Sequence, residues 1–143
     1  MNKKKVLFVC VENACRSQMA EGFARFFGAH VLDIYSAGSN PAKEVNPEAI
    51  RVMQEVNIDI SNQKPKGFNE LDNKEFDYVI TLGCHDVCPF VPARKHIEWD
   101  IEDPKGKSTY FFRQVREKIR EKVLKFIKSV ITEDIENADS KNQ

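Results

Sequence analysis

Apolar residues along the chain fall into short runs and into longer stretches with helical spacing. The short runs, at 5–9, 30–35, 76–82 and 96–99, are rich in β-branched and aromatic residues, which is typical of buried strands. Helical spacing appears at 17–27, at 46–56 and over the long stretch 109–131, where apolar residues three or four apart would face a core. Strands that alternate with helices predict an α/β fold.

These elements predict a four-stranded parallel sheet with helices on both faces. The chain has 143 residues, the length of one ordinary domain. We expect residues 1–131 to form this domain and the polar residues 132–143 to form a C-terminal tail. Asn46 is predicted to cap the second helix, with Pro47 at its first position. Residues 61–69 are polar and lack a period, so a surface loop is expected there.

Charge and chain length exclude several classes of partner. Acidic and basic residues number 22 each, so no overall field would draw the protein to nucleic acid or to an anionic membrane. The apolar run from Val6 to Val9 is too short for a secretory or membrane-spanning segment, and we expect a cytoplasmic monomer. Four cysteines in that compartment indicate metal binding, catalysis or redox cycling.

A polar loop joins the first predicted strand to the first predicted helix and consists of Cys10, Val11, Glu12, Asn13, Ala14, Cys15, Arg16 and Ser17. Such a loop can aim several backbone N–H groups at one point, where the helix dipole also favours an anion. The planar guanidinium of Arg16 can hold two oxygens of a tetrahedral oxyanion. The same potential stabilises a thiolate, so Cys10 is predicted to be a nucleophile without a histidine partner, with Ser17 as its hydrogen-bond donor.

A simpler interpretation makes Cys10 a buried core residue and Arg16 a solvated side chain, which is usual for an isolated pair. The order of strand, loop and helix favours the catalytic interpretation, because each element lies where an anion site needs it.

Three motifs together resemble the family that contains low-molecular-weight protein tyrosine phosphatases and thioredoxin-coupled arsenate reductases. They are Cys-x5-Arg-Ser after the first strand, Ser36-Ala37-Gly38 after the second, and Asp103-Pro104 late in the chain. The resemblance implies a phosphatase-like fold with flavodoxin-like topology. It also implies that Cys10 is the nucleophile, Arg16 the anion clamp and Asp103 the acid that protonates the leaving oxygen. Without the resemblance, Asp103 reads equally well as part of a solvated acidic turn.

Cys84 and Cys88 follow the third predicted strand, at the edge of a parallel sheet that would also carry Cys10. Residues four apart on a helical turn have Cα atoms about 6 Å apart, which a disulfide can span. Hydrolysis of a phosphate ester needs neither thiol. Reduction of arsenate needs a second thiolate that attacks the Cys10 sulfur.

Two further motifs, Thr81-Leu82-Gly83-Cys84 and Trp99-Asp100, extend the resemblance to the arsenate reductases of the family. It implies that Cys84 is the first resolving thiol and Cys88 the second, and that thioredoxin reduces the disulfide between them. Some relatives use glutaredoxin and glutathione instead, so the electron donor stays open.

Three other functions remain as alternatives. A low-molecular-weight phosphatase would share the cradle and the acid, although Phe68 is the one aromatic residue that loop 61–69 offers for stacking a substrate ring. An oxyanion-binding module would need the cradle but no reactive thiol. Cys84, Cys88, His85 and His96 form a possible zinc set, but their spacing lacks the second tight pair of ligands.

The remaining polar residues near the loop give weaker signals. Some relatives bind potassium at positions that match Asn13, Glu21 and Ser36, but residues 61–69 offer no convincing acidic partner, and we predict neither a metal nor a cofactor. Glu12 stands where a small residue is common, so its carboxylate either points outward or weakens anion binding. Cys15 is expected to be a small buried side chain that supports the turn, rather than a second reactive thiol.

Overall fold

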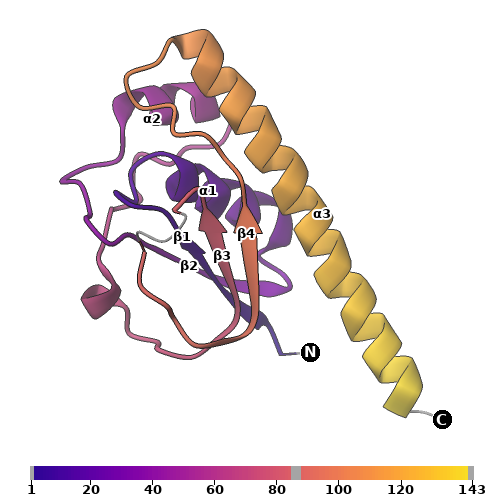
Figure 1. Ribbon diagram of the computed structural model, residues 1–143. Coiled ribbons are helices and arrows are strands. Elements are labelled where there is room, and N and C mark those ends of the chain that lie inside the picture. The colour runs from indigo at the N-terminus through magenta and orange to yellow at the C-terminus, as the bar shows by residue number, and fades with distance from the viewer. Residues whose placement is uncertain (1, 85–87, 142–143) are drawn as a thin grey trace.

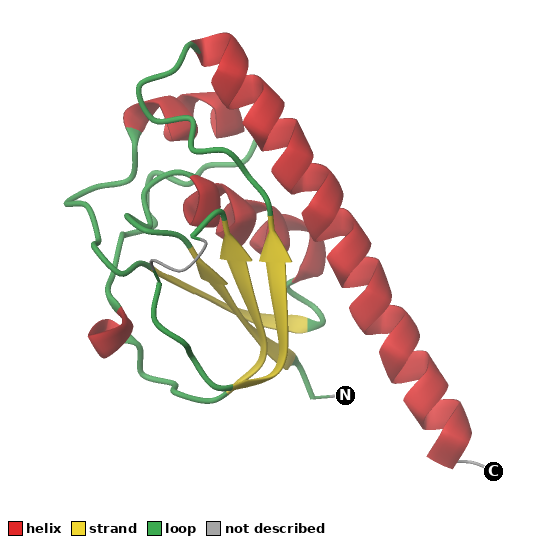
Figure 2. Cartoon of the chain, in the orientation of Figure 1, coloured by secondary structure: helices red, strands yellow, loops and turns green. Residues whose placement is uncertain are grey.

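The structure is a computed structural model that describes residues 2–84 and 88–141. Figures 1 and 2 show its strands and helices, which follow one another as β1 (Lys4–Val9), α1 (Arg16–Gly28), β2 (Leu32–Ala37), α2 (Pro47–Gln54), the 3-10 helix η1 (Phe68–Glu70), β3 (Phe76–Leu82), β4 (Ala93–Trp99) and α3 (Thr109–Lys141). The strands and helices expected from the sequence are all present. Strand β4 begins at Ala93, three positions before the predicted start at His96.

The four strands form one parallel sheet in the order β2-β1-β3-β4, as predicted. The chain leaves β1 for β2 on one side and returns to β3 on the other, so the order reverses between β1 and β3. Sheets of this kind bind ligands at such a switch point, beyond the carboxyl ends of the strands. Val9 at the end of β1 pairs in register with Thr81, and the loops after both strands therefore begin side by side.

All three α-helices pack on one face of the sheet, where α1 and α2 also contact α3. Val6, Phe8 and Ile80 point into this main core. Leu7 and Val9 point to the opposite face, which η1 and loops cover in the described residues. The expectation of helices on both faces therefore holds for one face only. The segments over the other face, at 61–75 and 88–92, are largely polar or proline-containing and lack a helical period.

Helix α2 begins with the predicted cap, whereas helix α3 continues beyond its predicted end. The Asn46 side chain accepts a hydrogen bond from the Glu48 amide at 2.8 Å, as expected of a helix cap. Helix α3 does not end near residue 131; it continues to Lys141, so the segment predicted as a tail is helical over this length. No glycine or proline interrupts residues 109–141, and nothing in the sequence stops the helix.

None of the helices in the described part of the chain has the length and apolar character that crossing a membrane requires.

Candidate active site

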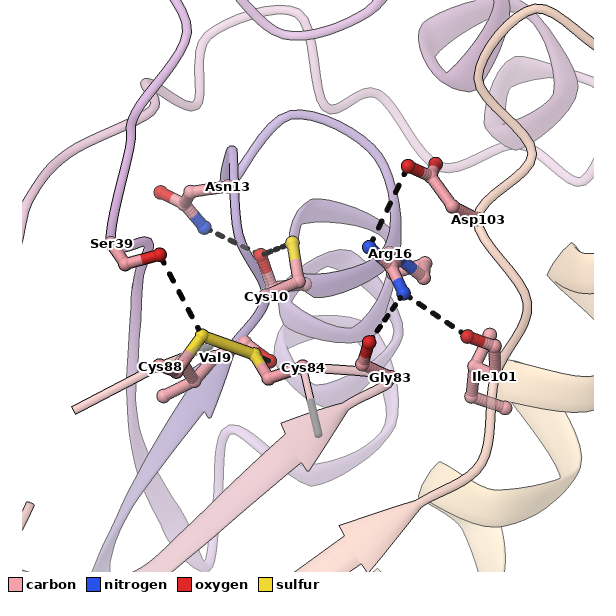
Figure 3. Close-up of a disulfide and its surroundings, with 11 residues drawn as sticks. Val9, Cys10, Asn13, Arg16, Ser39, Gly83, Cys84, Cys88, Ile101 and Asp103 are labelled. Carbon is pink, nitrogen blue, oxygen red and sulfur yellow. Dashed lines mark hydrogen bonds and ion pairs between the residues drawn. A yellow bond between two sulfur atoms is a disulfide. The ribbon is translucent and has the colours of Figure 1, made fainter. Parts of the chain in front are cut away.

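Cys10 lies directly after β1, at the start of the loop that leads into α1, and it is buried. Its Sγ is 2.9 Å from the Ser17 Oγ, and the Asn13 side-chain amide donates a hydrogen bond to that same oxygen at 2.6 Å (Figure 3). Because the Asn13 amide occupies an acceptor position of the hydroxyl, the hydroxyl hydrogen is free to point to sulfur. Ser17 is thus oriented to donate a hydrogen bond to the Cys10 sulfur.

Asn13 fixes the shape of the loop from its centre. Its φ of 51° places it in the left-handed region, which asparagine tolerates better than most residues. Its Oδ1 accepts hydrogen bonds from the Gln18 side chain at 3.1 Å and from the Lys66 amide at 3.0 Å. Gln18 also donates to the Asn13 carbonyl at 3.0 Å. Asn13 is therefore tied both to α1 and to the segment after α2.

The backbone of the loop is turned so that its carbonyls face outward. Three of them accept hydrogen bonds from the segment 40–46: Val11 O from Asn40 N at 2.8 Å, Glu12 O from Ala42 N at 2.9 Å, and Ala14 O from Asn46 N at 3.0 Å. In a trans peptide the N–H points opposite to the carbonyl, and the described chain has no cis peptide. The next amides therefore point toward the inside of the loop, which is the arrangement of an anion cradle.

Gly38 closes the outside of the same loop. A Cβ at this position would lie 2.5 Å from the Val11 carbonyl oxygen and 2.7 Å from that of Cys10. Only glycine allows so close an approach of the two backbones. This packing gives a physical reason for the Ser36-Ala37-Gly38 motif.

Arg16 is held by backbone oxygens and keeps one edge of its guanidinium available. Its Nη1 donates to the carbonyls of Ile101 at 3.1 Å and Gly83 at 3.3 Å, while Nη2 lies 3.7 Å from Asp103 Oδ2. Its Nε is buried and has no hydrogen-bond partner. A buried donor without a partner is costly, and Nε and Nη2 together present the fork that binds two oxygens of an oxyanion.

Asp103 lies beside this guanidinium at the mouth of the loop, and its side chain is 50% exposed. Its Oδ1 accepts a hydrogen bond from the Lys105 amide at 3.0 Å. The structure thus brings the loop that carries Cys10 and Arg16 together with the distant segment that carries Asp103, with the thiol buried and the carboxylate at the rim.

The charge of Glu12 is neutralised by a lysine from the Asp103 loop. Lys105 Nζ lies 2.9 Å and 3.0 Å from the two carboxylate oxygens of Glu12. The hydrogen bond and the charge of Glu12 raise the pKa of Lys105. The sequence left open whether the Glu12 carboxylate points outward or weakens anion binding. In the structure it points outward and is paired with Lys105 at the rim.

Cys84 and Cys88 are joined by a disulfide with a Cα–Cα distance of 5.7 Å, which confirms that these two residues can pair. Cys84 is buried, and its Sγ lies 3.5 Å from the carbonyl oxygen of Val9, the residue before Cys10. Cys88 is partly exposed, and its Sγ lies 3.9 Å from Ser39 Oγ. Figure 3 shows the disulfide beside the start of the nucleophile loop.

The Cys15 side chain is buried, as expected. It is 6% exposed, and burial, followed by the charge of Asp103, raises the pKa of its thiol to about 12. A thiol with such a pKa remains protonated near neutral pH and is a poor nucleophile.

The candidate metal ligands have other partners. Two members of the possible zinc set form the disulfide, and His96 Nε2 lies 2.7 Å from the Val91 carbonyl oxygen. His85 lies outside the described residues. Of the residues that match a potassium site, Glu21 accepts a hydrogen bond from Ser36 and pairs with Arg25 at 3.1 Å. Across residues 2–84 and 88–141, no three His, Cys, Asp or Glu side chains gather as a metal site would require.

Sequence reasoning missed three residues that support the site. Gly83 has a φ of +73°, and a Cβ there would collide with Arg16 Nη1 and with the Ile101 carbonyl oxygen. Gln18 is fully buried and holds Asn13. Lys105 holds both Glu12 and Asp103. Gly83 carried a signal, since a glycine directly after a buried strand often marks a close backbone approach.

Comparison with known proteins gives consistent matches over most of the chain. Residues 5–136 match the family model described as low molecular weight phosphotyrosine protein phosphatase. The chain is 43% identical over 130 residues to an arsenate reductase of Bacillus cereus (strain 03BB102), covering 87% of this chain and 95% of the relative. It is 42% identical over 130 residues to the glutaredoxin arsenate reductase of a Synechocystis species, covering 89% and 98%.

Among solved structures, the thioredoxin-dependent arsenate reductase of Corynebacterium glutamicum is similar, with a TM-score of 0.76 and 31% identity over 92% of this chain and 63% of that chain.

Proposed function

We propose that this chain, which belongs to the low molecular weight phosphotyrosine protein phosphatase family, is an arsenate reductase that passes electrons through Cys10, Cys84 and Cys88. The observation that carries the proposal is the Cys84–Cys88 disulfide at the sheet edge that also holds Cys10. Ester hydrolysis has no use for a second pair of thiols, whereas arsenate reduction requires them. The named activity of the relatives supports the same choice.

The first step forms a bond between sulfur and arsenic. Arsenate binds in the cradle of residues 11–17, against the inward amides and the edge of Arg16 formed by Nε and Nη2. The Cys10 thiolate, stabilised by Ser17, attacks arsenic. Asp103 supplies the proton with which the displaced oxygen leaves as water. The product is a thiol adduct of arsenic(V) on Cys10.

The second step reduces arsenic. The Cys84 thiolate attacks the Cys10 sulfur, and the sulfur–arsenic bond breaks with its electron pair going to arsenic, which leaves as arsenite. A Cys10–Cys84 disulfide remains. The Cys88 thiolate then attacks Cys84, which frees the Cys10 thiolate and forms the Cys84–Cys88 disulfide.

An external dithiol completes the cycle by reducing this disulfide and becoming oxidised itself. Cys88 is the accessible sulfur, because Cys84 is 1% exposed and Cys88 is partly exposed. We propose thioredoxin or glutaredoxin as this donor, since one relative is named for each. The relay needs a reducing compartment and uses residues of one chain, so we further propose a cytoplasmic monomer.

A single turnover tests the relay. Reduced protein is mixed with excess arsenate and no external thiol, and arsenite and free thiols are measured. We expect about one arsenite and about two lost thiols per chain, since one disulfide holds two electrons, with the disulfide mapped to Cys84 and Cys88. Unchanged thiols together with rapid hydrolysis of a phosphate ester would instead support a phosphatase, for which the family match is the favouring observation.

Two serine variants separate the roles of the second pair of thiols. Cys84→Ser should lose arsenite release and keep any ester hydrolysis. Cys88→Ser is the matched control, because it should still release arsenite in one turnover and stop with a Cys10–Cys84 disulfide. Equal loss of arsenite release and ester hydrolysis in Cys84→Ser would contradict the division of labour.

A further inference from the structure

An ion pair connects the nucleophile loop with the loop that carries Asp103. Glu12 and Lys105 form it, and we call them the rim pair. They are 93 positions apart in the sequence, and Lys105 Nζ contacts both carboxylate oxygens of Glu12 at 2.9 Å and 3.0 Å. The side chain of Glu12 is 32% exposed and that of Lys105 58% exposed, so the pair lies at the surface rather than inside the cradle.

The rim pair is also attached to the proton donor. While its side chain holds Glu12, the backbone amide of Lys105 donates to Asp103 Oδ1 at 3.0 Å. The other oxygen of Asp103 lies 3.7 Å from Arg16 Nη2. Nucleophile loop, rim pair, proton donor and anion clamp therefore form one connected set of charges around the entrance.

The in-line geometry of the displacement determines which part of a substrate lies near the rim pair. In an in-line displacement the leaving oxygen lies opposite the attacking sulfur, and Asp103 must reach that oxygen to protonate it. A substituent on the oxygen would have to extend outward past Asp103, which accepts a hydrogen bond from the backbone amide of Lys105 in the rim pair. Arsenate has no such substituent, because its leaving group is water.

We propose that the rim pair determines substrate size: it narrows the entrance so that inorganic oxyanions are admitted and phosphate monoesters of bulky alcohols are disfavoured. The proposal rests on the proposed function, since it explains how one cradle prefers arsenate to an ester. Neutralisation of Glu12 is part of the device, because an unpaired carboxylate at the rim would repel every anionic substrate. The contribution is moderate, since an exposed ion pair is individually weak.

Variants of the pair separate size selection from charge. Glu12→Ala combined with Lys105→Ala removes both side chains without leaving a net charge. We expect the ratio of kcat/KM for 4-nitrophenyl phosphate hydrolysis to kcat/KM for arsenate reduction to rise roughly fivefold, the factor that an exposed ion pair can impose. Lys105→Ala alone should weaken both reactions, because Glu12 is left unpaired. The exchanged pair, Glu12→Lys with Lys105→Glu, should restore the original preference.

A second ion pair provides the matched control. On α3, Lys125 Nζ lies 2.9 Å from Glu121 Oε1, and both side chains are exposed. This pair lies outside the site. Glu121→Ala combined with Lys125→Ala should leave the ratio of the two kcat/KM values unchanged. An unchanged ratio in the rim-pair double variant as well would overturn the inference, even if both rates fell, because a purely structural role affects both substrates together.

A binding measurement keeps this inference separate from the proposed function. Alkylation of Cys10 by iodoacetamide is followed with inorganic phosphate or phenyl phosphate as protecting ligand, and no arsenate is needed. For equal protection of Cys10, wild type should need a higher concentration of phenyl phosphate than of inorganic phosphate. The difference between these two concentrations should be smaller in the double variant. If arsenite never forms but this difference shrinks, the proposed function fails and the inference stands. If arsenate is reduced and the difference stays the same, the inference fails alone.

Discussion

At the scale of single residues, the site depends on positions where backbones come very close. Arg16 reaches its place by donating to the Gly83 and Ile101 carbonyls. A side chain at Gly83 would occupy the space of the guanidinium. Gly106, near the Asp103 loop, also has a positive φ of +80°, but nothing lies within 4 Å of its would-be Cβ. A side chain at either glycine would strain the backbone, but only one at Gly83 would also collide with Arg16.

Gly83→Ala and Gly106→Ala test this difference. Each should lose about 1 kcal/mol of unfolding free energy for the left-handed backbone, measured by urea denaturation. Gly83→Ala should lose more, and phosphate should protect its Cys10 from alkylation about tenfold less well, because the bidentate contact of Arg16 is displaced. Similar phosphate affinity in both variants would show that Arg16 tolerates the added methyl group.

At the scale of elements, the polar C-terminal part of α3 makes contacts with the sheet. The Tyr78 hydroxyl of β3 donates to Glu133 at 2.7 Å, and Lys4 of β1 lies 4.0 Å from Asp134. Burial and the hydrogen bond to Glu133 raise the pKa of Tyr78. Residues 132–134 therefore attach α3 to the start of the sheet, although their composition resembles a tail.

Two truncations measure this attachment. A chain ending at Ile131 should lose about 1–2 kcal/mol of unfolding free energy, because the buried Tyr78 hydroxyl loses its partner. A chain ending at Glu136 keeps both contacts and should lose no more than about 0.5 kcal/mol.

Combining the shorter chain with Tyr78→Phe gives a double-mutant cycle. The truncation should cost less in that background, since no hydroxyl is left without a partner. An equal cost in both backgrounds would exclude the hydrogen bond as the cause.

At the scale of the whole molecule, the disulfide lies outside the main core. Cys84 belongs to the smaller cluster on the loop-covered face, whereas the helices pack on the other face. The fold therefore has a main apolar core to which neither cysteine of the disulfide contributes. The proposed relay opens this disulfide in every cycle, which requires a fold that is stable without it.

Reduction of the disulfide should accordingly leave the protein folded. A disulfide between cysteines four positions apart closes a very short loop and contributes about 2 kcal/mol at most in the chain-entropy model. Urea denaturation of oxidised and reduced protein should give two cooperative transitions that differ by no more than this. The variant with Cys84→Ser and Cys88→Ser should match the reduced protein, and loss of cooperative unfolding on reduction would contradict the expectation.

The sequence by itself determined the strands, the order of the helices and the place of residues 10–17 between the first strand and the first helix, because these depend on local signals. The run before Cys10, the helical spacing after Arg16 and the cap at Asn46 are each readable within a few positions. The tertiary structure decided which distant residues meet. The partner of Glu12 is Lys105, the backbone that holds Arg16 comes from Gly83 and Ile101, and the helices gather on one face of the sheet. These contacts join segments far apart in the sequence, and only packing of the whole chain brings them together.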